Sequence, residues 1–401
     1  MLKDESSPAL ASPAALETTP LERPTGLGLT GRPLPLGAVG FVGLGHMGSA
    51  MAANLAATGI RVIAYVRRQD QIEKLKSLSL EPTTDFTELL KCKVVISMLT
   101  DDDAAREIVF GRKDIGLIGL AKGLTPGAIH LSMSTISTAT VSQLQSEHER
   151  HGQGFVAAPV FGNPAAAGAR QLFIAAAGAP ADVEICLPLL DNLGRQTFVV
   201  GHNPADASLY KLLGNMITAT ALEMLGEAIA VIRKRGLDPK PFMDLMTSTN
   251  FGGRAHKLFG DKIVAQNYEP GFVIPLALKD VRLALTEAES AGVPMPSVAV
   301  VRDRMITGIA RGHAGLDWSA LGLIAGEEAG IIQASTGAAQ PQALVTPERG
   351  MRAALALDAP ASPRRLRVHR DDARPTLARL RPRDPARLAR SARNRATPAR
   401  P

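Results

Sequence analysis

Short apolar runs alternate with longer mixed segments through the first half of the chain. The runs occupy residues 38–42, 61–66, 93–98, 128–132 and 154–158, and a last one ends at Val200. Apolar runs of this length, bounded by glycine and polar residues, are typical of buried strands. Because strands that alternate with helices build a parallel sheet covered on both faces, this half predicts an α/β domain with a mostly parallel sheet.

The pattern becomes helical from Ser208 onward. Apolar residues then recur mostly at three- and four-residue steps as far as Ile232, and Gly236 and Pro239 mark the end of the segment. This predicts one helix of about 28 residues, long enough to join two domains. Further helices are predicted near residues 241–247, 275–291, 297–312 and 319–329. No strand pattern interrupts them, so the second domain is predicted to be all helical.

The two ends of the chain differ from its middle. Residues 1–36 hold six prolines and no aromatic residue, which predicts a disordered leader. The last part of the chain is rich in Arg, Pro and Ala, which predicts a disordered tail. We therefore expect four segments: a leader at 1–36, the sheet domain at 37–202, the helical domain at 203–335 and the tail at 336–401.

The net charge of +7 is concentrated in the tail. Residues 342–401 carry fifteen arginines and five acidic residues, a net charge of +10, which leaves −3 on the rest of the chain. The tail has no aromatic residue to stack on bases, so a nucleic-acid-binding arm is disfavoured.

Targeting and redox signals are weak. No apolar stretch reaches the roughly 18 residues of a membrane span, and the N-terminus lacks the apolar core of a secretory signal. We expect a cytoplasmic protein without a membrane partner. Cys92 and Cys186 lie beside apolar runs, which indicates small buried side chains, and no metal site is predicted.

A glycine-rich turn follows the first predicted strand. It fits the pattern G-x-G-x-x-G and stands between a strand and a helix, which is the context that a Rossmann dinucleotide-binding motif needs. The first glycine allows the tight turn, the second lets a pyrophosphate approach the backbone, and the third lets the helix pack on the sheet. The phosphates then meet the N–H groups of a helix N-terminus. The residues assigned to cofactor binding here are Gly43, Leu44, Gly45, His46, Met47 and Gly48.

Two arginines, Arg67 and Arg68, follow the second predicted strand. An NAD site places Asp or Glu at this point to bind the ribose hydroxyls. A carboxylate would repel a 2′-phosphate, whereas guanidinium groups bind one through charge-assisted hydrogen bonds. The pair therefore predicts NADP (NADPH) as the cofactor. Leu99 and Thr100, which follow the strand at 93–98, are assigned to the same cofactor site.

Residues 37–330 resemble the β-hydroxyacid dehydrogenase family, which includes 3-hydroxyisobutyrate dehydrogenase and glyoxylate reductases. The glycine turn is similar to the family's G-x-G-x-M-G, and Ala158-Pro159-Val160 to part of its substrate-binding D-x-P-V-S-G-G. The resemblance implies that Ser134 lies near the nicotinamide and the substrate. It also implies that Lys211 and Asn215 are the catalytic K-x-x-x-N pair, that Lys279 of the Lys279-Asp280 pair reaches the cofactor, and that the protein is a homodimer.

The chemistry expected of Lys211 also follows from the reaction. When hydride reaches a carbonyl carbon, the developing alkoxide needs a proton donor or a positive charge beside it. A lysine at the domain junction supplies both, and Asn215, four residues on, lies on the same helical face to orient the lysine or the substrate. Lys279 has a second interpretation as a surface ion pair with Asp280, and Asp317-Trp318 is interpreted as a packing anchor.

Three departures from the family pattern concern the substrate. Phe161-Gly162-Asn163 stands where the family's Ser-Gly-Gly holds a substrate carboxylate, Ala157 replaces the Asp of that motif, and Gly201-His202-Asn203-Pro204-Ala205 replaces a glycine-rich segment before the lysine. Phe161, Gly162 and Asn163 are still assigned to the substrate site, together with Ser134 and Lys211. Phe in place of Ser removes a hydrogen-bond donor and adds apolar bulk, which favours a larger or less anionic substrate.

Three other functions compete with an NADP-dependent dehydrogenase that acts on a small hydroxy acid or aldehyde. A decarboxylating sugar-acid dehydrogenase is disfavoured because Thr218 stands where that class carries Glu. An imine reductase usually replaces the lysine by Asp or Tyr, but the unusual Phe161 keeps this alternative open. A catalytically idle NADP-binding module that presents its tail to a partner also remains, although the retained Lys211 argues against it.

Overall fold

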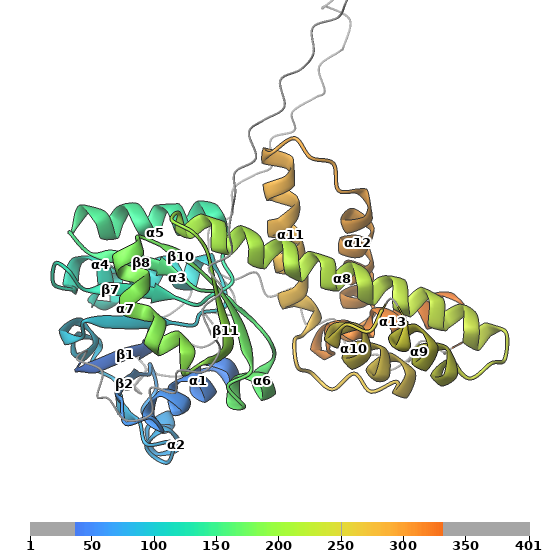
Figure 1. Cartoon of the computed structure of the whole chain (residues 1–401), viewed down its shortest axis with the longest axis horizontal. Helices are drawn as coiled ribbons and strands as arrows, with labels where there is room; N and C mark the ends of the chain where they lie inside the picture. Colours follow the sequence, from blue (N-terminus) through green and yellow to red (C-terminus); the bar gives the residue numbers. More distant parts are fainter. Residues whose placement is uncertain (1–36, 250, 332–401) are drawn as a thin grey trace, which may run out of the picture. The chain divides into compact units, whose positions relative to one another are not determined.

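A computed structural model describes residues 37–249 and 251–331 of the chain (Figure 1). The predicted leader and tail lie outside the described residues. The described chain begins with alternating strands and helices and continues with helices alone from Pro204 onward. The predicted fold class, a mostly parallel α/β part followed by a helical part, is confirmed.

Nine strands form the sheet of the first part. They are β1 (Ala38–Val42), β2 (Arg61–Tyr65), β3 (Glu81–Thr83), β4 (Val94–Ser97), β7 (Ile129–Ser132), β8 (Gly154–Ala157), β9 (Val160–Phe161), β10 (Leu172–Gly178) and β11 (Gly194–Gly201). The order is β11-β10-β8-β7-β4-β1-β2-β3, with β9 beside β10. Neighbours are parallel except where β10 meets β8 and β9. A separate small pair consists of β5 (Gly111–Arg112) and β6 (Leu117–Ile118).

Helices cover both faces of this sheet, because alternate residues of each strand point to opposite sides. Val39 and Phe41 of β1 pack in one apolar cluster with α1 and α7, whereas Val42 packs on the other face with α3 and α4. The helices of this part are α1 (His46–Ala56), α2 (Ile72–Lys76), α3 (Asp102–Phe110), α4 (Leu120–Gly123), α5 (Thr138–Arg150), α6 (Pro164–Gly168) and α7 (Pro180–Asp191). Cys92 and Cys186 are buried free thiols, as expected.

Three strands of the sheet were not predicted: β3, β9 and β10. The longest of them, β10, ends in three alanines and a glycine, which have low strand propensity, so its pattern carries little strand signal. The last predicted strand, which ends at Val200, is longer than expected and forms β11. The sheet therefore extends two strands past β8, and β10 and β11 run against the direction of the others.

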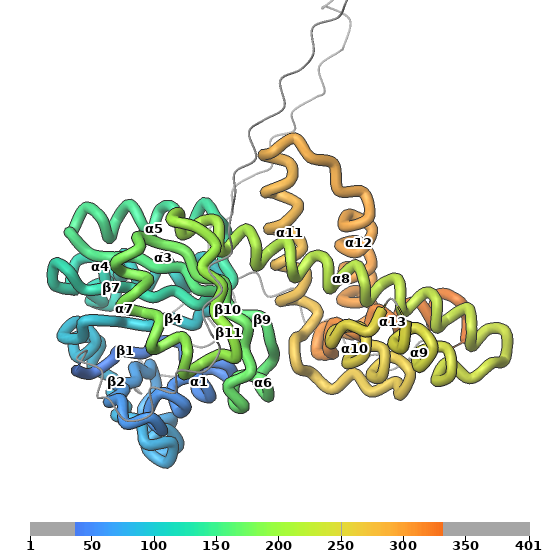
Figure 2. The backbone as a smooth tube through the Cα atoms, in the orientation of Figure 1, coloured from blue at the N-terminus to red at the C-terminus, as the bar shows by residue number. Residues whose placement is uncertain are grey.

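The second part is built around one long helix. The helices are α8 (Pro204–Lys234), α9 (Pro239–Ser248), α10 (Arg254–Ala265), α11 (Ile274–Ser290), α12 (Pro296–Ala310) and α13 (Leu321–Glu328). Figure 2 shows α8 running from the sheet into the helical part, and its residues contact β10 and α5 as well as α10, α11 and α13. Helix α10 was not predicted, although its apolar residues recur at the three- and four-residue steps of an amphipathic helix.

Helix α8 is long and apolar enough, by length and mean hydropathy, to cross a membrane. The prediction concerned an uninterrupted apolar stretch, and polar residues such as Lys211, Asn215 and Glu223 interrupt α8; the helix meets only the criterion of mean hydropathy over an 18-residue window. The helix nevertheless buries polar side chains, among them Lys211, Asn215 and Glu223. Because it packs against α10, α11 and α13, it is the central helix of the helical part.

The Asp317-Trp318 pair anchors the end of the helical part. The buried Asp317 carboxylate accepts hydrogen bonds from the backbone N–H groups of Gly271 and Phe272 and pairs with Lys262 at 3.2 Å. The Trp318 ring meets Phe272 edge to face. The structure agrees with the packing role expected for this pair.

Candidate active site

The glycine turn joins β1 to α1 as a tight loop. Gly43 has a φ of +93°, and a side chain there would collide with the carbonyl oxygen of Met98 at the end of β4. A side chain at Gly48 would strike the Gly43 carbonyl, whereas Gly45 has open space where a side chain would stand. The backbone thus requires glycine at Gly43 and Gly48, and at Gly45 it leaves space through which a ligand can reach the main chain.

The N-terminus of α1 fits a phosphate group. Gly45 caps the helix without a side-chain hydrogen bond, so no side-chain oxygen occupies the N–H groups of the first turn. Such N–H groups and the helix dipole bind anions. Leu44 and Met47 pack on the apolar core beneath the loop, and His46 is exposed. The residues present therefore fit the pyrophosphate of a dinucleotide.

Arg67 and Arg68 lie just beyond β2 with their side chains mostly in solvent. Arg67 pairs with Glu107 of α3 at 3.1 Å, and Arg68 pairs with Asp70 at 3.4 Å. The exposed fractions of the two arginine side chains are 56% and 69%, so both are accessible to a ligand.

Ser134 supports the loop after β4. Its side chain is buried and its hydroxyl oxygen accepts a hydrogen bond from the backbone N–H of Leu99 at 2.7 Å. The next residue, Thr100, offers its backbone carbonyl to the Lys279 ammonium group at 3.1 Å. The structure thus brings Leu99, Thr100, Ser134 and Lys279 together, although Ser134 faces the loop rather than an open space.

Lys211 and Asn215 lie one turn apart on α8 and touch. The Lys211 ammonium group donates a hydrogen bond of 2.8 Å to the Asn215 side-chain oxygen, and both residues are buried. Burial lowers the pKa of Lys211 to about 8, because the charged form loses solvation; Asp280 opposes this shift and Lys279 adds to it. A lysine with a pKa near neutrality can both donate and accept a proton.

Phe161 covers this lysine. The Lys211 nitrogen stands 4.5 Å from the centre of the Phe161 ring, within the range of a cation–π contact. The ring also lies so close to Gly214 that any side chain at that position would collide with it. Phe161, the residue that departs from the family motif, therefore packs on α8 at Lys211 and Gly214.

The two residues after Phe161, Gly162 and Asn163, shape the turn into α6. Gly162 has a φ of +146°, and a side chain there would meet Leu172. Asn163 caps α6: its side-chain oxygen accepts a hydrogen bond from the backbone N–H of Ala166 at 2.9 Å. Of the three residues assigned to the substrate from the family motif, only Phe161 contacts Lys211 in this structure.

The Lys279-Asp280 pair of α11 lies close enough to Lys211 to act on it by charge. Lys279 makes an ion pair with Asp280 at 3.0 Å and donates hydrogen bonds to the carbonyl oxygens of Thr100 and Thr135. The ion pair expected between Lys279 and Asp280 is present, although Asp280 is buried, and the contact of Lys279 with a cofactor stays a prediction.

Sequence reasoning missed the role of Asp280 in this group. Its buried carboxylate accepts a hydrogen bond of 2.6 Å from the Asn215 amide, 65 residues earlier in the chain. One sequence signal could have indicated this role: Asp280 follows Lys279, which the family resemblance assigned to the cofactor site. An acidic residue beside a site lysine is a candidate partner for the polar residues of α8.

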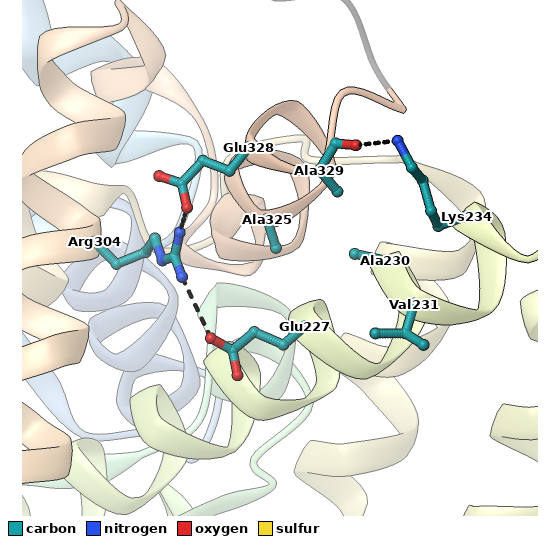
Figure 3. Close-up of a pocket in the computed structure, with 8 residues that line it drawn as sticks. All are labelled: Glu227, Ala230, Val231, Lys234, Arg304, Ala325, Glu328 and Ala329. Atoms are coloured by element: carbon teal, nitrogen blue, oxygen red, sulfur yellow. Dashed lines mark hydrogen bonds and ion pairs between the residues drawn. The ribbon is translucent and has the colours of Figure 1, made fainter.

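A cavity of about 240 Å³ lies elsewhere, between α8, α12 and α13 (Figure 3). Alanines and Val231 form its wall, and Glu227, Glu328, Arg304 and Lys234 surround it. Glu227 is sixteen residues beyond Lys211 on α8, about 24 Å along the helix axis. This cavity is therefore separate from the lysine and the glycine turn.

Two family models match the chain in succession. Residues 38–201 match the NAD-binding domain of 6-phosphogluconate dehydrogenase, and residues 205–324 match the NAD-binding domain of NADP-dependent 3-hydroxyisobutyrate dehydrogenase. Both halves of the site described above fall inside these matches.

Several proteins similar to this chain are named as oxidoreductases or reductases. The chain is 34% identical to the uncharacterized oxidoreductase YfjR of Bacillus subtilis, over 71% of this chain and 98% of that one. It is 31% identical to glyoxylate/succinic semialdehyde reductase 1 of Arabidopsis thaliana, over 71% and 96%. In fold it is similar to 3-hydroxyisobutyrate dehydrogenase of Salmonella typhimurium, with a TM-score of 0.64, 20% identity and coverage of 72% and 99%. The chain belongs to the β-hydroxyacid dehydrogenase family, whose members are NAD(P)-dependent oxidoreductases that act on CH–OH groups.

Proposed function

We propose that the protein is an NADP-dependent oxidoreductase that interconverts a small hydroxy acid or alcohol with its aldehyde or ketone. The observation that carries this proposal is the buried Lys211, hydrogen-bonded to Asn215 and with its pKa lowered to about 8. A buried lysine at the junction of a dinucleotide-binding sheet and a helical part suits proton transfer to a substrate oxygen.

In this reaction the bound nicotinamide supplies or takes up the hydride. Lys211 stabilises the negative charge that develops on the substrate oxygen and gives that oxygen a proton in the direction of reduction. Asn215 accepts a hydrogen bond from the lysine and thereby directs its ammonium group. In the direction of oxidation the neutral lysine takes the hydroxyl proton.

We infer NADP rather than NAD from Arg67 and Arg68. Both guanidinium groups are accessible beyond β2, and no carboxylate occupies the position that would bind a ribose hydroxyl in an NAD site. The neighbouring Glu107 holds Arg67 from the side of α3, so this arginine is already directed when a phosphate arrives.

We propose that the substrate is a carbonyl compound whose part near Phe161 is apolar and carries no carboxylate. The phenyl ring beside Lys211 offers apolar surface and no hydrogen-bond donor. A carboxylate in that place would lose its hydration without a compensating partner.

The decisive experiment is turnover of purified protein with NADPH and with NADH against short aldehydes, semialdehyde acids, keto acids and cyclic imines. We expect NADPH oxidation with aldehydes or keto compounds. Turnover of the imines alone would replace the proposal by an imine reductase. Tight NADPH binding without turnover of any carbonyl compound would favour the idle binding module.

We also propose a homodimer formed through α8. Tyr210, Ile217, Met224 and Val231 are spaced seven residues apart, so they share one face of the helix, and the exposed fraction of each is between 52% and 64%. Such a stripe suits packing against the same stripe of a second copy around a two-fold axis.

Light scattering tests the dimer. We expect twice the monomer mass at micromolar concentration, and the Ile217→Glu/Met224→Glu variant should be monomeric. Ile115→Glu changes an equally exposed apolar residue outside the helical part and should leave the dimer intact. A monomeric parent protein would refute the proposal.

We further propose that the protein is cytoplasmic and that the domain boundary lies between β11 and α8.

A further inference from the structure

A chain of polar contacts runs from Lys211 through Asn215, both on α8, to Asp280 on α11. Lys211 donates to the Asn215 oxygen at 2.8 Å, and the Asn215 amide donates to one Asp280 oxygen at 2.6 Å. Because an amide has an acceptor end and a donor end, this arrangement lets the Asn215 side chain adopt only one orientation. That orientation turns its oxygen toward the Lys211 ammonium group.

The chain of contacts continues to the cofactor edge. The second Asp280 oxygen lies 3.0 Å from the Lys279 ammonium group, as an ion pair whose geometry is not that of a hydrogen bond. Lys279 in turn donates to the backbone carbonyl oxygens of Thr100 and Thr135, which follow β4 and β7. One lysine therefore touches both the carboxylate and the two loops beside the predicted nicotinamide site.

Two charged groups among the described residues act on Lys211, and both belong to α11. Helix α11 contributes Asp280 and Lys279, β9 contributes the uncharged Phe161 ring, and α8 itself contributes the neutral Asn215. Asp280 favours the charged form of Lys211 and Lys279 disfavours it. Two adjacent residues of α11 thus act on the lysine with opposite sign.

We propose that Asp280 is a positioning residue of the reaction: it fixes the Asn215 amide, which holds the Lys211 ammonium group, and Lys279 balances its charge. The proposal rests on the function proposed for Lys211. Asp280 then acts on Lys211 through Asn215 and does not itself contact the cofactor. The protonation of Lys211 also depends on Lys279, which binds the loops after β4 and β7.

The alternative is that Asp280 only joins the helices. A carboxylate buried to 98% that ties α8 to Lys279 would stabilise the packing whether or not Lys211 takes part in chemistry. The charges of Asp280 and Lys279 are expected to shift the pKa of Lys211 in opposite directions in either case. Packing alone, however, does not lower kcat in a variant that retains its melting temperature, so the pKa of Lys211 and kcat are read together.

The test measures the pKa of Lys211 directly, without substrate. Trace acetylation of the full-length protein over a series of pH values, with mass spectrometry of the Lys211 peptide, reports the fraction of neutral amine. The exposed Lys74 serves as the internal standard. Asp280→Asn retains the shape of the side chain and an oxygen that can accept from Asn215, but it replaces the charge by a neutral amide. Asp280→Leu also removes the acceptor that fixes Asn215, so a lower kcat in Asp280→Leu than in Asp280→Asn, below the pKa of Lys211, reports the loss of positioning.

We expect Asp280→Asn to lower the pKa of Lys211 by about one unit and Lys279→Met to raise it by a smaller amount. The descending limb of the pH profile for carbonyl reduction should move in the same directions. Glu287→Gln is the matched control, because Glu287 also lies on α11 and also contacts the sheet part, at Thr138, but it is seven residues further on, about 10 Å away.

The outcomes distinguish this inference from the proposed function. Unchanged labelling profiles in both variants, shifts of the same sign, or an equal shift in Glu287→Gln would overturn the positioning role, whatever the activity. If the shifts appear but Lys211→Ala retains full turnover, the contacts are as described and the proposed function fails instead.

Discussion

The glycine turn with its two arginines and the group around Lys211 use charge in opposite ways. Arg67 and Arg68 stand in solvent, where their charges cost little and where each has one carboxylate neighbour. Lys211 is buried, and its charge is held by Asn215 and by Asp280 beyond it. Exposed charges suit recognition of a charged ligand, whereas a buried charge has a pKa that its neighbours can shift.

This difference predicts how the two regions respond to substitution. Loss of an exposed arginine should change the affinity for one ligand and little else. Loss of the buried lysine should change the rate of the reaction and leave the ligand bound. The experiments below test that separation, from the largest expected effect to the smallest.

Lys211→Ala should lower the turnover number by a factor of about 100 to 10,000, the usual range for one positioned acid–base group. NADPH affinity should stay nearly unchanged, because the glycine turn and the arginines are intact. Lys211→Arg should restore little, since guanidinium is a far poorer acid at neutral pH. Steady-state kinetics and a fluorescence titration of NADPH measure the two quantities.

Asn215→Ala should cost less, about ten-fold, because it removes the group that directs the lysine and not the proton itself. The fall in turnover is compared with the fall in kcat/KM to separate rate from binding. A Lys211→Ala protein that keeps more than about a tenth of the activity would remove the lysine from the chemistry, and the imine-reductase alternative would then come first.

The rate of carbonyl reduction should depend on pH through Lys211. The protonated lysine is the donor, so the rate should be steady below its pKa of about 8 and fall about ten-fold for each pH unit above it. Oxidation of the alcohol needs the neutral lysine and should rise over the same interval. A profile flat from pH 7 to about 10 in both directions would contradict the assignment of the lysine as acid and base.

NADPH should bind at least ten-fold tighter than NADH, a difference of about 1.4 kcal/mol. The double variant Arg67→Ala/Arg68→Ala should lose this preference and bind NADH nearly as before. Calorimetric titration of both dinucleotides gives the comparison. Equal affinities in the parent protein would show that the arginines do not read the 2′-phosphate.

The smallest effect is expected from removing both ends of the chain. Deletion of residues 1–36 and 342–401 should shift the melting temperature by a few degrees and turnover by no more than about two- to three-fold, because composition predicts no packed core there. Differential scanning calorimetry measures the first quantity. A large loss of stability would show that an end packs on the folded part.

Local patterns predicted most of the fold, because they depend on neighbours in sequence. The first strand, the glycine turn and the long helix each carry their own signal of period, length and glycine spacing. Strand β10 carries little, since Ala175, Ala176 and Ala177 fit a helix as well as a strand. Its reversed direction is a property of the sheet, which no segment encodes alone.

The site was predictable to a lesser extent. Lys211 and Asn215 are one turn apart, so their contact follows from the helix period. The contact between Asn215 and Asp280 follows only from the packing of α8 against α11, which places residues 65 positions apart together. Asn163, whose assignment to the substrate stays a prediction, also carries a local signal: Asn before Pro at a helix start is typical of a cap, and Asn163 caps α6.

The close approach of Phe161 to Gly214 has a consequence for protein engineering. The ring occupies the space that a side chain at position 214 would need, so the two positions cannot be varied independently. A library that enlarges residue 214 in the parent background would mostly return misfolded or inactive clones. The same library built on Phe161→Ser would have room to accept it, and new substrates should be sought in such paired libraries.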